Sequence, residues 1–463
     1  MAHETADLAN YLGNLTYDDL PAAVVEIAKL CVLDIVGVAI ASTNRPWSTI
    51  ITATMVDGYG PDEASLWGQS VGASARTAAM VNGTAAHGIE MDDRVPRSSM
   101  HPGCYAVSAA LAVTEKVGGS GRDLLTAVVS GYELGLRIGS AMHMRKGVHK
   151  SGHKGVWPAV GAAAHAHRLT AGQMQDAFGL AGSMASGLFQ FHQDPSRTMV
   201  KRLHGGFAAH NGVLATELAA NGFDGPGAIL EGECGYIRTY GDDGIAPRWD
   251  LLTDGLGQTF RILDREVKPY AAWGGSHNAI DAVAGIHART CLDPSEIVSI
   301  RIGGSRRLIV AHELTEPESV MAAQYSLPFL TAVALVRGAE SLVDPATIWV
   351  DATLGDRQIA EVVSKIEMHV DEDLEELSVR HRTYGGARVA VMTRDGSVHE
   401  HLVLDSKGTV GNPMSRPEIE RKFRLVAGRV IGEKQAAALI DACASLNDLD
   451  DLAALSGALR TAR

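Results

Sequence analysis

Apolar patterns with helical periodicity fill roughly the first 265 residues of the chain. The segment AAVVEIAKLCVLDIVGVAIA, which follows Pro21, is almost continuously apolar and predicts a long buried helix. Residues 126–142 and 160–169 also predict helices, and their many Gly and Ala residues allow close packing between neighbours. Capping boxes at Ser120 and Thr170 predict where further helices begin. Strand-like alternation is scarce in this part, so it is predicted to be helical.

The pattern changes after about residue 265. Residues 297–304 and 387–404 alternate between apolar and polar positions as strands do. Arg394-Asp395-Gly396 predicts a hairpin turn within the second of these segments. Residues 320–337 and 356–364 predict helices between the strands, so this part combines both kinds of element.

The predicted fold is therefore mainly α, with a large all-helical domain and a smaller α+β domain. A capping box at Ser415 begins further helices, which we expect to return to the first domain. The expected extents are residues 1–265 for the helical domain, residues 405–463 for the C-terminal helices that complete it, and residues 266–404 for the α+β domain.

Composition and charge narrow the classes of function. The formal net charge is −13, which argues against nucleic-acid binding, because no general basic surface exists to displace counterions from phosphates. Local basic segments can still bind a small anion. The five cysteines are widely spaced and odd in number, so we expect reduced thiols in a cytoplasmic protein. Neither a signal peptide nor a membrane span is predicted.

Titratable side chains are dense in residues 80–103, where two prolines predict a loop after a helix. Carboxylates, histidines and arginines that share a loop suit proton transfer, because each neighbour tunes the pKa of the others. The alternative is an ordinary helix end with solvated charges. The residues concerned are His87, Glu90, Asp92, Asp93, Arg94, Arg97 and His101.

Three further basic segments suit an anion, although each is also consistent with a solvated loop. They span residues 143–157, 199–212 and 267–283. His149 and His153 are four residues apart, but the glycines around them make a metal-binding helix improbable. The sequence lacks the common nucleotide-binding, serine-hydrolase and CxxC patterns. The side chains concerned are His149, His153, Lys154, Lys201, Arg202, His204, Lys268, Tyr270 and His277.

The four segments, in this order, resemble the MmgE/PrpD family, which includes 2-methylcitrate dehydratase, cis-aconitate decarboxylase and iminodisuccinate epimerase. The resemblance covers nearly the whole chain and rests on the ordered sum of modest motifs. These are CVLDIVGVAIAS, VNGTAAHGIEMDD followed by HPG, VSGYELGLRIG, VKRLHGGFAAHNGVLA, KPY with SHNAIDA, AAQYSLPF and GNPMSRPEIERKF.

The resemblance implies an active site between the helical domain and a lid formed by the smaller domain. It also implies a homodimer, and chemistry without a metal or an organic cofactor. His153 matches a second family histidine, although Lys154 follows it where the family has Pro. The positions that match the family's active-site residues are Glu90, Arg94, His101, Lys201 and Lys268.

Three positions depart from the family pattern. Glu90 stands where Asp is common, and Arg94 stands where the decarboxylase and the epimerase often have Thr or Ser. Phe329 stands where the decarboxylase has an active-site Tyr, with Tyr325 close by in the sequence. These departures point away from decarboxylation and toward a different substrate.

The predicted function is a lyase, a dehydratase of the 2-methylcitrate type, that acts on a small di- or tricarboxylate by acid–base chemistry. The alternatives are an epimerase of a carboxylate-bearing carbon, a decarboxylase of the cis-aconitate type, and a binding protein without catalysis. The only predicted partners are this small anionic substrate and a second copy of the chain. No metal, cofactor, nucleic acid or membrane is expected to bind.

The predicted site has a proton-transfer part and a carboxylate-binding part. His101 is expected to titrate near neutral pH, because a helix N-terminus lowers its pKa while nearby carboxylates raise it. The predicted catalytic residues are His101, His153, Glu90 and Asp93, and the predicted substrate-binding residues are Lys201, Lys268, Arg94, His204, Tyr270 and Tyr325.

Overall fold

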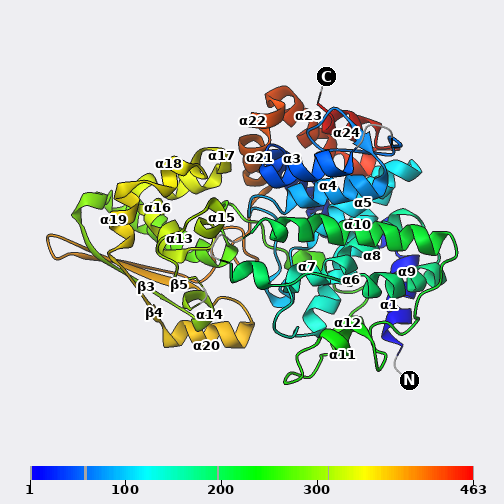
Figure 1. Ribbon diagram of the computed structural model, residues 1–463, viewed down its shortest axis with the longest axis horizontal. Helices are drawn as coiled ribbons and strands as arrows, with labels where there is room; N and C mark the ends of the chain where they lie inside the picture. Colours follow the sequence, from blue (N-terminus) through cyan, green and yellow to red (C-terminus); the bar gives the residue numbers. More distant parts are fainter. Residues whose placement is uncertain (1–2, 57–59, 195–197, 311, 462–463) are drawn as a thin grey trace.

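A large helical body and a smaller lid make up the computed structural model, which describes residues 3–56, 60–194, 198–310 and 312–461 (Figure 1). The helices of the body are α1 (Glu4–Asn14), α2 (Ala22–Ser42), α3 (Pro46–Met55), α4 (Ala75–Ala86), α5 (Pro102–Val117), α6 (Gly121–Ala141), α7 (Lys150–Lys154), α8 (Val156–Ala166), α9 (Ala171–Ser183), α10 (Val200–Ala220), α11 (Tyr236–Tyr240) and α12 (Asp250–Thr253). A two-stranded antiparallel ladder, β1 (Ala64–Ser65) with β2 (Gly72–Ala73), lies before α4.

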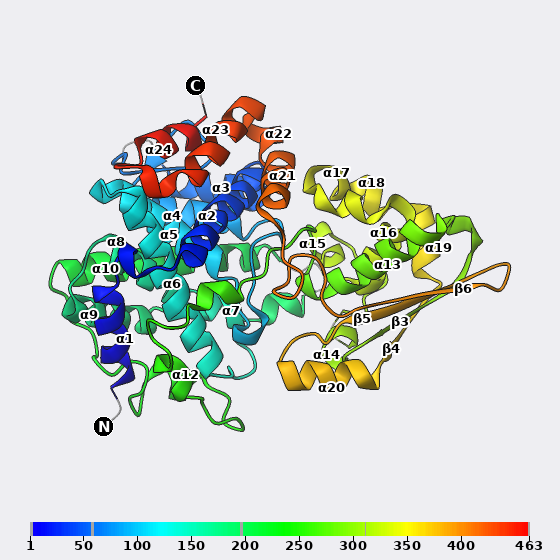
Figure 2. The ribbon, with the colours of Figure 1, turned by 180° about the vertical axis from the view of Figure 1, so that it is seen from behind.

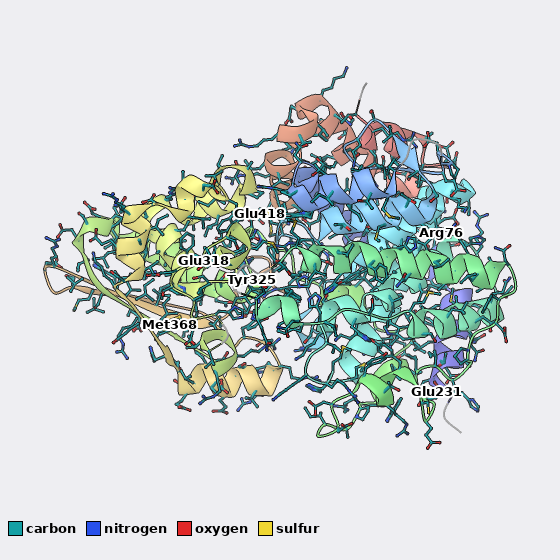
Figure 3. All side chains as sticks on the ribbon, viewed as in Figure 1. Arg76, Glu231, Glu318, Tyr325, Met368 and Glu418 are labelled. Atoms are coloured by element: carbon teal, nitrogen blue, oxygen red, sulfur yellow. The ribbon has the colours of Figure 1, made fainter. Side chains whose placement is uncertain are left out.

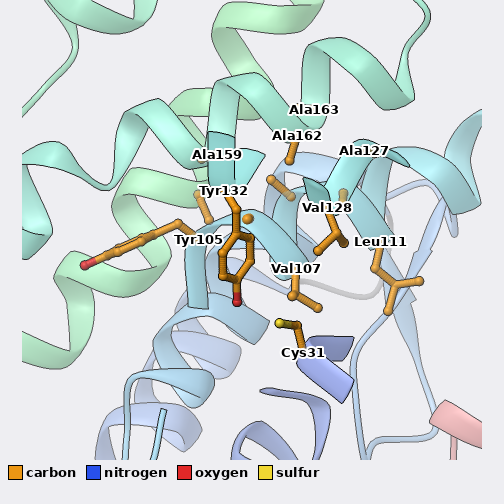
Figure 4. Close-up of a cluster of buried hydrophobic side chains, with 14 of the residues drawn as sticks. Cys31, Tyr105, Val107, Leu111, Ala127, Val128, Tyr132, Ala159, Ala162 and Ala163 are labelled. Atoms are coloured by element: carbon orange, nitrogen blue, oxygen red, sulfur yellow. The ribbon is translucent and has the colours of Figure 1, made fainter. Parts of the chain in front are cut away.

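Small residues let the helices of the body pack so closely that their backbones are in contact. Gly131 and Gly135 of α6 lie directly against Pro158 of α8. A Cβ added at Gly205 of α10 would lie 2.5 Å from the carbonyl oxygen of Gly83 in α4, which leaves no room for a larger side chain. The first turns of α10 therefore lie beside the loop that follows α4. Figure 4 shows part of the core between the helices, where two Tyr rings are surrounded by Val and Ala side chains.

The C-terminal helices pack back onto the body, next to α2 (Figure 2). They are α21 (Arg416–Val426), α22 (Gly428–Ile431), α23 (Glu433–Ala444) and α24 (Ala453–Leu459). Lys422 of α21 is buried, and its Nζ donates to Asp34 Oδ1 of α2 at 2.6 Å and to the Met91 carbonyl oxygen at 2.9 Å. The returning tail therefore anchors the loop that follows α4.

Replacing Lys422 by Met is expected to destabilise the protein by about 3–5 kcal/mol, because it leaves the Asp34 carboxylate buried without its cation. The free energy of unfolding in urea measures this loss. In the matched control, Lys422→Met combined with Asp34→Leu, most of the loss should be recovered, since no buried charge is then left unpaired. A single variant as stable as wild type would show that the pair contributes nothing.

The lid is built on a four-stranded sheet of order β4-β3-β5-β6. β3 (Ile297–Gly304) pairs parallel with β4 (Ile366–Val370) and antiparallel with β5 (Ala387–Thr393), which forms the hairpin with β6 (Val398–Val403). α13 and α16 lie on one side of the sheet, and α14 and α20 lie on the other (Figure 1). The lid helices are α13 (His277–Thr290), α14 (Arg306–Ile309), α15 (Val320–Ala323), α16 (Leu327–Arg337), α17 (Pro345–Ile348), α18 (Asp351–Leu354), α19 (Arg357–Val363) and α20 (Glu372–His381).

The mainly helical fold with a smaller α+β part is confirmed, as are the three capping boxes and the hairpin. The helix predicted over 320–337 is broken between α15 and α16, where Ser326 caps the second helix. β4, the β1–β2 ladder and α7 were not predicted, because short elements leave little periodicity. Among the described residues, none of the helices combines the length and the apolar character needed to cross a bilayer. The domain boundaries remain predictions.

Candidate active site

Glu90 is the centre of a buried cluster of charges between the body and the lid. It lies in the loop after α4, and its backbone φ of 58° is in the left-handed region that non-glycine residues rarely adopt. Its neighbours Ile89 and Met91 pack into the hydrophobic core of the lid. The unusual backbone turns the Glu90 side chain toward basic residues instead, and such a local constraint is common at functional sites.

Two of these basic residues come from the first turn of α10. Lys201 and Arg202 both form short hydrogen-bonded ion pairs with Glu90 Oε1. Arg202 also donates to the His87 carbonyl oxygen at 3.0 Å and to Gln324 Oε1 at 3.0 Å. The basic segment 199–212 was also consistent with a loop, but α10 begins at Val200 and contains Lys201 and Arg202. Lys201 and Arg202 are therefore held by a helix.

Lys268 and Tyr325 reach Glu90 from the lid side. The hydroxyl of Tyr325, at the junction of lid and body in Figure 3, donates to Glu90 Oε1 at 3.0 Å. Lys268 Nζ lies 3.5 Å from Glu90 Oε2 and 3.4 Å from Asp92 Oδ1. Lys268 Nζ is buried and has no acceptor at hydrogen-bond geometry within the described ranges. It is therefore the cation with most capacity for an additional carboxylate.

His101 lies next to this cluster and is held by Asp92 and Asp93. Its Nδ1 is 2.8 Å from the Asp93 carbonyl oxygen and 3.4 Å from Asp92 Oδ2. A carbonyl oxygen only accepts, so Nδ1 carries the proton and Nε2 keeps a free lone pair. His87 makes a similar contact, 2.6 Å from Nδ1 to Asp92 Oδ2, and its ring centroid lies 5.3 Å from that of His101.

Burial and charge set the protonation of the cluster. Burial alone would raise the pKa of Glu90, but Lys201, Arg202 and Lys268 outweigh it and hold that pKa well below its ordinary value. Burial lowers the pKa of Lys201 to about 8, against the opposing effect of Glu90. Burial also lowers the pKa of His101 to about 3, although Asp92 acts to raise it. The expectation that His101 titrates near neutral pH is wrong, because the effect of burial outweighs that of the carboxylates.

The second histidine near His101 is His149 rather than His153. The His149 ring centroid lies 6.2 Å from that of His87, and its Nδ1 shares a 2.9 Å hydrogen bond with Nδ1 of His204. His153 Nδ1 instead shares a 2.9 Å hydrogen bond with the Tyr236 hydroxyl. The short helix α7 separates the two histidines: His149 is its N-cap, while His153 lies in its last turn.

Three other predicted residues are turned away from the Glu90 carboxylate. The Asp93 carboxylate accepts from the Tyr132 hydroxyl at 2.5 Å and from the Gly103 amide at 2.9 Å, so it anchors the start of α5. Arg94 pairs with Glu266 at 2.8 Å. The Tyr270 hydroxyl donates to Asp281 at 2.7 Å within the lid.

His87, Asp92 and Cys104 are the one set in the described part of the chain whose ligand atoms could hold a metal ion, all within 4.8 Å of one another. Without a metal, Asp92 Oδ2 is engaged by His87 Nδ1. Burial raises the pKa of the Cys104 thiol well above its ordinary value, so in this state the side chain is a protonated thiol.

Comparisons with known proteins cover nearly the whole chain. Residues 6–247 match the MmgE/PrpD N-terminal domain, and residues 270–448 match the MmgE/PrpD C-terminal domain. A cis-aconitate decarboxylase from Aspergillus terreus (strain NIH 2624 / FGSC A1156) is 27% identical over 97% of this chain and 94% of its own length. A cis-aconitate decarboxylase-like protein from Aspergillus oryzae is 28% identical, over 98% of both chains.

A human cis-aconitate decarboxylase is 24% identical over 98% of this chain and 94% of its own length. The two family matches together include most of the body and the lid, and they contain the charged residues around Glu90 except Lys268, which lies between the two matched ranges. The predicted resemblance is confirmed, and with it the prediction of an enzyme of this type. The chain belongs to the MmgE/PrpD family.

Proposed function

We propose that this enzyme is a lyase that cleaves a small di- or tricarboxylate by proton transfer at the Glu90 cluster. The observation that carries the proposal is the meeting of three buried cations, Lys201, Arg202 and Lys268, beside His101. Buried cations in such number suit a substrate with more than one carboxylate, because charge-assisted hydrogen bonds are strongest when water is excluded.

A reaction sequence follows from the tautomers and charges of the cluster. His101 Nε2 is the free base, and it removes a proton from a carbon next to a substrate carboxylate. Negative charge then develops on that carboxylate, where Lys268 and Lys201 stabilise it. The β-hydroxyl then leaves as water by taking up a proton that the His149–His204 pair relays from solvent, and His101 releases its proton to solvent, which completes a dehydration. Asp92 is a positioning residue, since it fixes His87 and helps to orient His101.

Decarboxylation is the second candidate, and the names of the relatives favour it. Three relatives with 24–28% identity over nearly the whole chain are cis-aconitate decarboxylases or decarboxylase-like. The Tyr325 hydroxyl on Glu90 provides a buried proton donor for the carbon that loses CO₂. Phe329, by contrast, is buried in the lid core and offers no hydroxyl.

Proton NMR on a panel of di- and tricarboxylates in D₂O tests the proposed function. A dehydratase gives an alkene and water, and a decarboxylase gives CO₂ and a product one carbon shorter. An epimerase would exchange the proton and keep the carbon skeleton, which would contradict the lyase proposal. Binding of panel members without any turnover would indicate a binding protein instead.

Replacing Lys268 by Met is expected to lower kcat/KM by about 10–100-fold, because a charge-assisted contact to the substrate carboxylate is lost. Met keeps the length of the side chain, so the packing should persist. Steady-state kinetics on the substrate found above measure the effect. Lys365→Met is the control, since its exposed pair with Glu361 lies far from the cluster in the fold. Unchanged kinetics in Lys268→Met would remove Lys268 from the site.

We also propose a homodimer in the cytoplasm. Large apolar side chains are exposed in the region of residues 188–207, which flanks the cluster: Leu188, Phe189, Met199, Val200 and Phe207 are 38–68% exposed. Monomeric proteins rarely leave so many exposed together. Sedimentation velocity should give about twice the 48.9 kDa of one chain. A species with the mass of one chain, 48.9 kDa, that persists at high protein concentration would contradict the dimer.

A further inference from the structure

Cations from both the body and the lid gather at a second place, beside the Glu90 cluster. We call them the junction cluster: Arg97, Lys150, Lys154, Arg307 and Arg382. Within the parts of the chain that are described, none of them forms an ion pair with an acidic side chain. The chain carries a net charge of −13, so this gathering is not a general property of its surface.

The five cations are close enough to act on one another. After burial, the largest influences that lower the pKa of Arg382 are Arg248, Arg307 and Arg97. Burial and then Arg307 lower the pKa of Lys150, with only Asp242 opposing. Repulsion of this kind destabilises the closed arrangement of lid and body unless an anion offsets it.

Lys154 is the buried member of the junction cluster. Its side chain is at the end of α7 with 1% of the residue exposed, and its Nζ donates to the carbonyl oxygen of Ser98. Burial, together with the nearby charges of Lys150 and Arg382, lowers its pKa to about 7. Buried ammonium groups are normally paired with an anion. Here the nearest charged neighbours are cations, so an anion from outside the chain would supply the counter-charge of protonated Lys154.

Arg382 brings a lid cation to this place by an unusual backbone. It ends α20 with a φ of 56°, in the left-handed region. Its guanidinium donates to Nε2 of His143 in the body, which must therefore be the neutral acceptor. At this contact between the lid and the body, a cation donates to a neutral imidazole. The contact therefore provides no negative charge to offset that of Arg382.

The ring of Tyr384 contacts both Arg307 of the junction cluster and Arg94 of the loop after α4. Arg307 lies over the ring of Tyr384 at 4.5 Å, and Arg94 lies over the same ring at 5.7 Å. Arg94 Nη1 is buried and has no hydrogen-bond partner among the described residues. An anion held here would therefore lie on the same side of the Tyr384 contact as Arg307, with Arg94 as a further cation nearby.

We infer that the junction cluster is a second anion-binding site, which takes one phosphate or carboxylate group between the lid and the body. The ligand contacts Lys154 and Lys150 from α7 and Arg382 and Arg307 from the lid, so binding draws the two parts together. The anion is either a free ion or the distal acidic group of the substrate. The inference does not depend on which reaction the Glu90 cluster catalyses.

Isothermal titration of the full chain with inorganic phosphate tests the inference without any turnover. One phosphate should bind per chain, and Arg307→Gln or Arg382→Gln should weaken binding by about tenfold or more. Arg306→Gln is the matched control, because Arg306 is an exposed neighbour in α14 whose side chain is outside the cluster. Lys154→Met should also weaken binding while the thermal midpoint stays the same or rises.

The remaining outcomes separate the possibilities. If a saturating tricarboxylate leaves phosphate binding to the wild type unchanged, the site holds a free anion. If the tricarboxylate weakens phosphate binding to the wild type but not the residual binding to Arg307→Gln or Arg382→Gln, the site holds the distal group of the substrate. Phosphate binding that is lost in Lys268→Met but kept in Arg382→Gln would place the anion at Glu90 and overturn the inference. Absence of phosphate binding to the wild type would overturn it too.

Discussion

Replacing His101 by Gln is expected to lower kcat by roughly 10²–10⁴, the usual contribution of a general acid or base. Gln keeps a donor that can reach the Asp93 carbonyl oxygen, but it has no basic nitrogen to accept the substrate proton. Substrate binding should persist, since the cations around Glu90 remain. Stopped-flow or steady-state kinetics, together with a binding isotherm, separate the two effects.

The competing role for His101 is purely structural, as the residue before the first turn of α5. The structure gives its side chain no capping hydrogen bond to that helix. The thermal midpoint of His101→Gln should therefore stay close to that of wild type. A clearly lowered midpoint with nearly normal kcat would assign His101 to the fold rather than to the reaction.

Replacing His149 by Gln is expected to lower kcat by about 10²-fold or more, whereas His153→Gln should change it less than about threefold. His149 shares a hydrogen bond with His204 and lies close to His87, which is next to His101. The His153 ring packs on Tyr240, with centroids 4.3 Å apart, and its Nδ1 is engaged by Tyr236. Of these two histidines, we therefore expect His149 to exchange a proton with a substrate at the cluster.

The two variants control for each other, because both remove a buried imidazole from the same short helix. A loss of kcat in His153→Gln, with normal turnover in His149→Gln, would reverse the assignment and restore the correspondence drawn from sequence. Equal losses in both variants, with lowered thermal midpoints, would show that α7 matters for the fold and that neither ring acts directly.

The sequence predicts the fold well where elements are long and strongly patterned. The apolar run after Pro21 forms α2 over Ala22–Ser42, and the strand-like alternation of 387–404 forms β5 and β6. Short elements escaped prediction. β4 has five residues that are all partly exposed or exposed, so it shows no clean alternation.

The site was predicted in part, because residue type indicates chemistry while backbone direction decides which side chains meet. Glu90, Lys201 and Lys268 were identified by charge, and the structure brings them together. Of two adjacent carboxylates, Asp92 faces the histidines and Asp93 faces Tyr132, a choice that depends on the path of the loop.

The most direct test of the central claim is hydrogen exchange at the carbon next to a substrate carboxylate. Wild type, His101→Gln and Lys268→Met would each be incubated in D₂O with every di- and tricarboxylate that binds, and deuterium uptake measured by mass spectrometry. Wild type should incorporate deuterium into the substrate or product that it turns over. His101→Gln should lose this incorporation while still binding, and Lys268→Met should lose it through weaker binding. Incorporation by His101→Gln at the wild-type rate would contradict proton transfer at the Glu90 cluster.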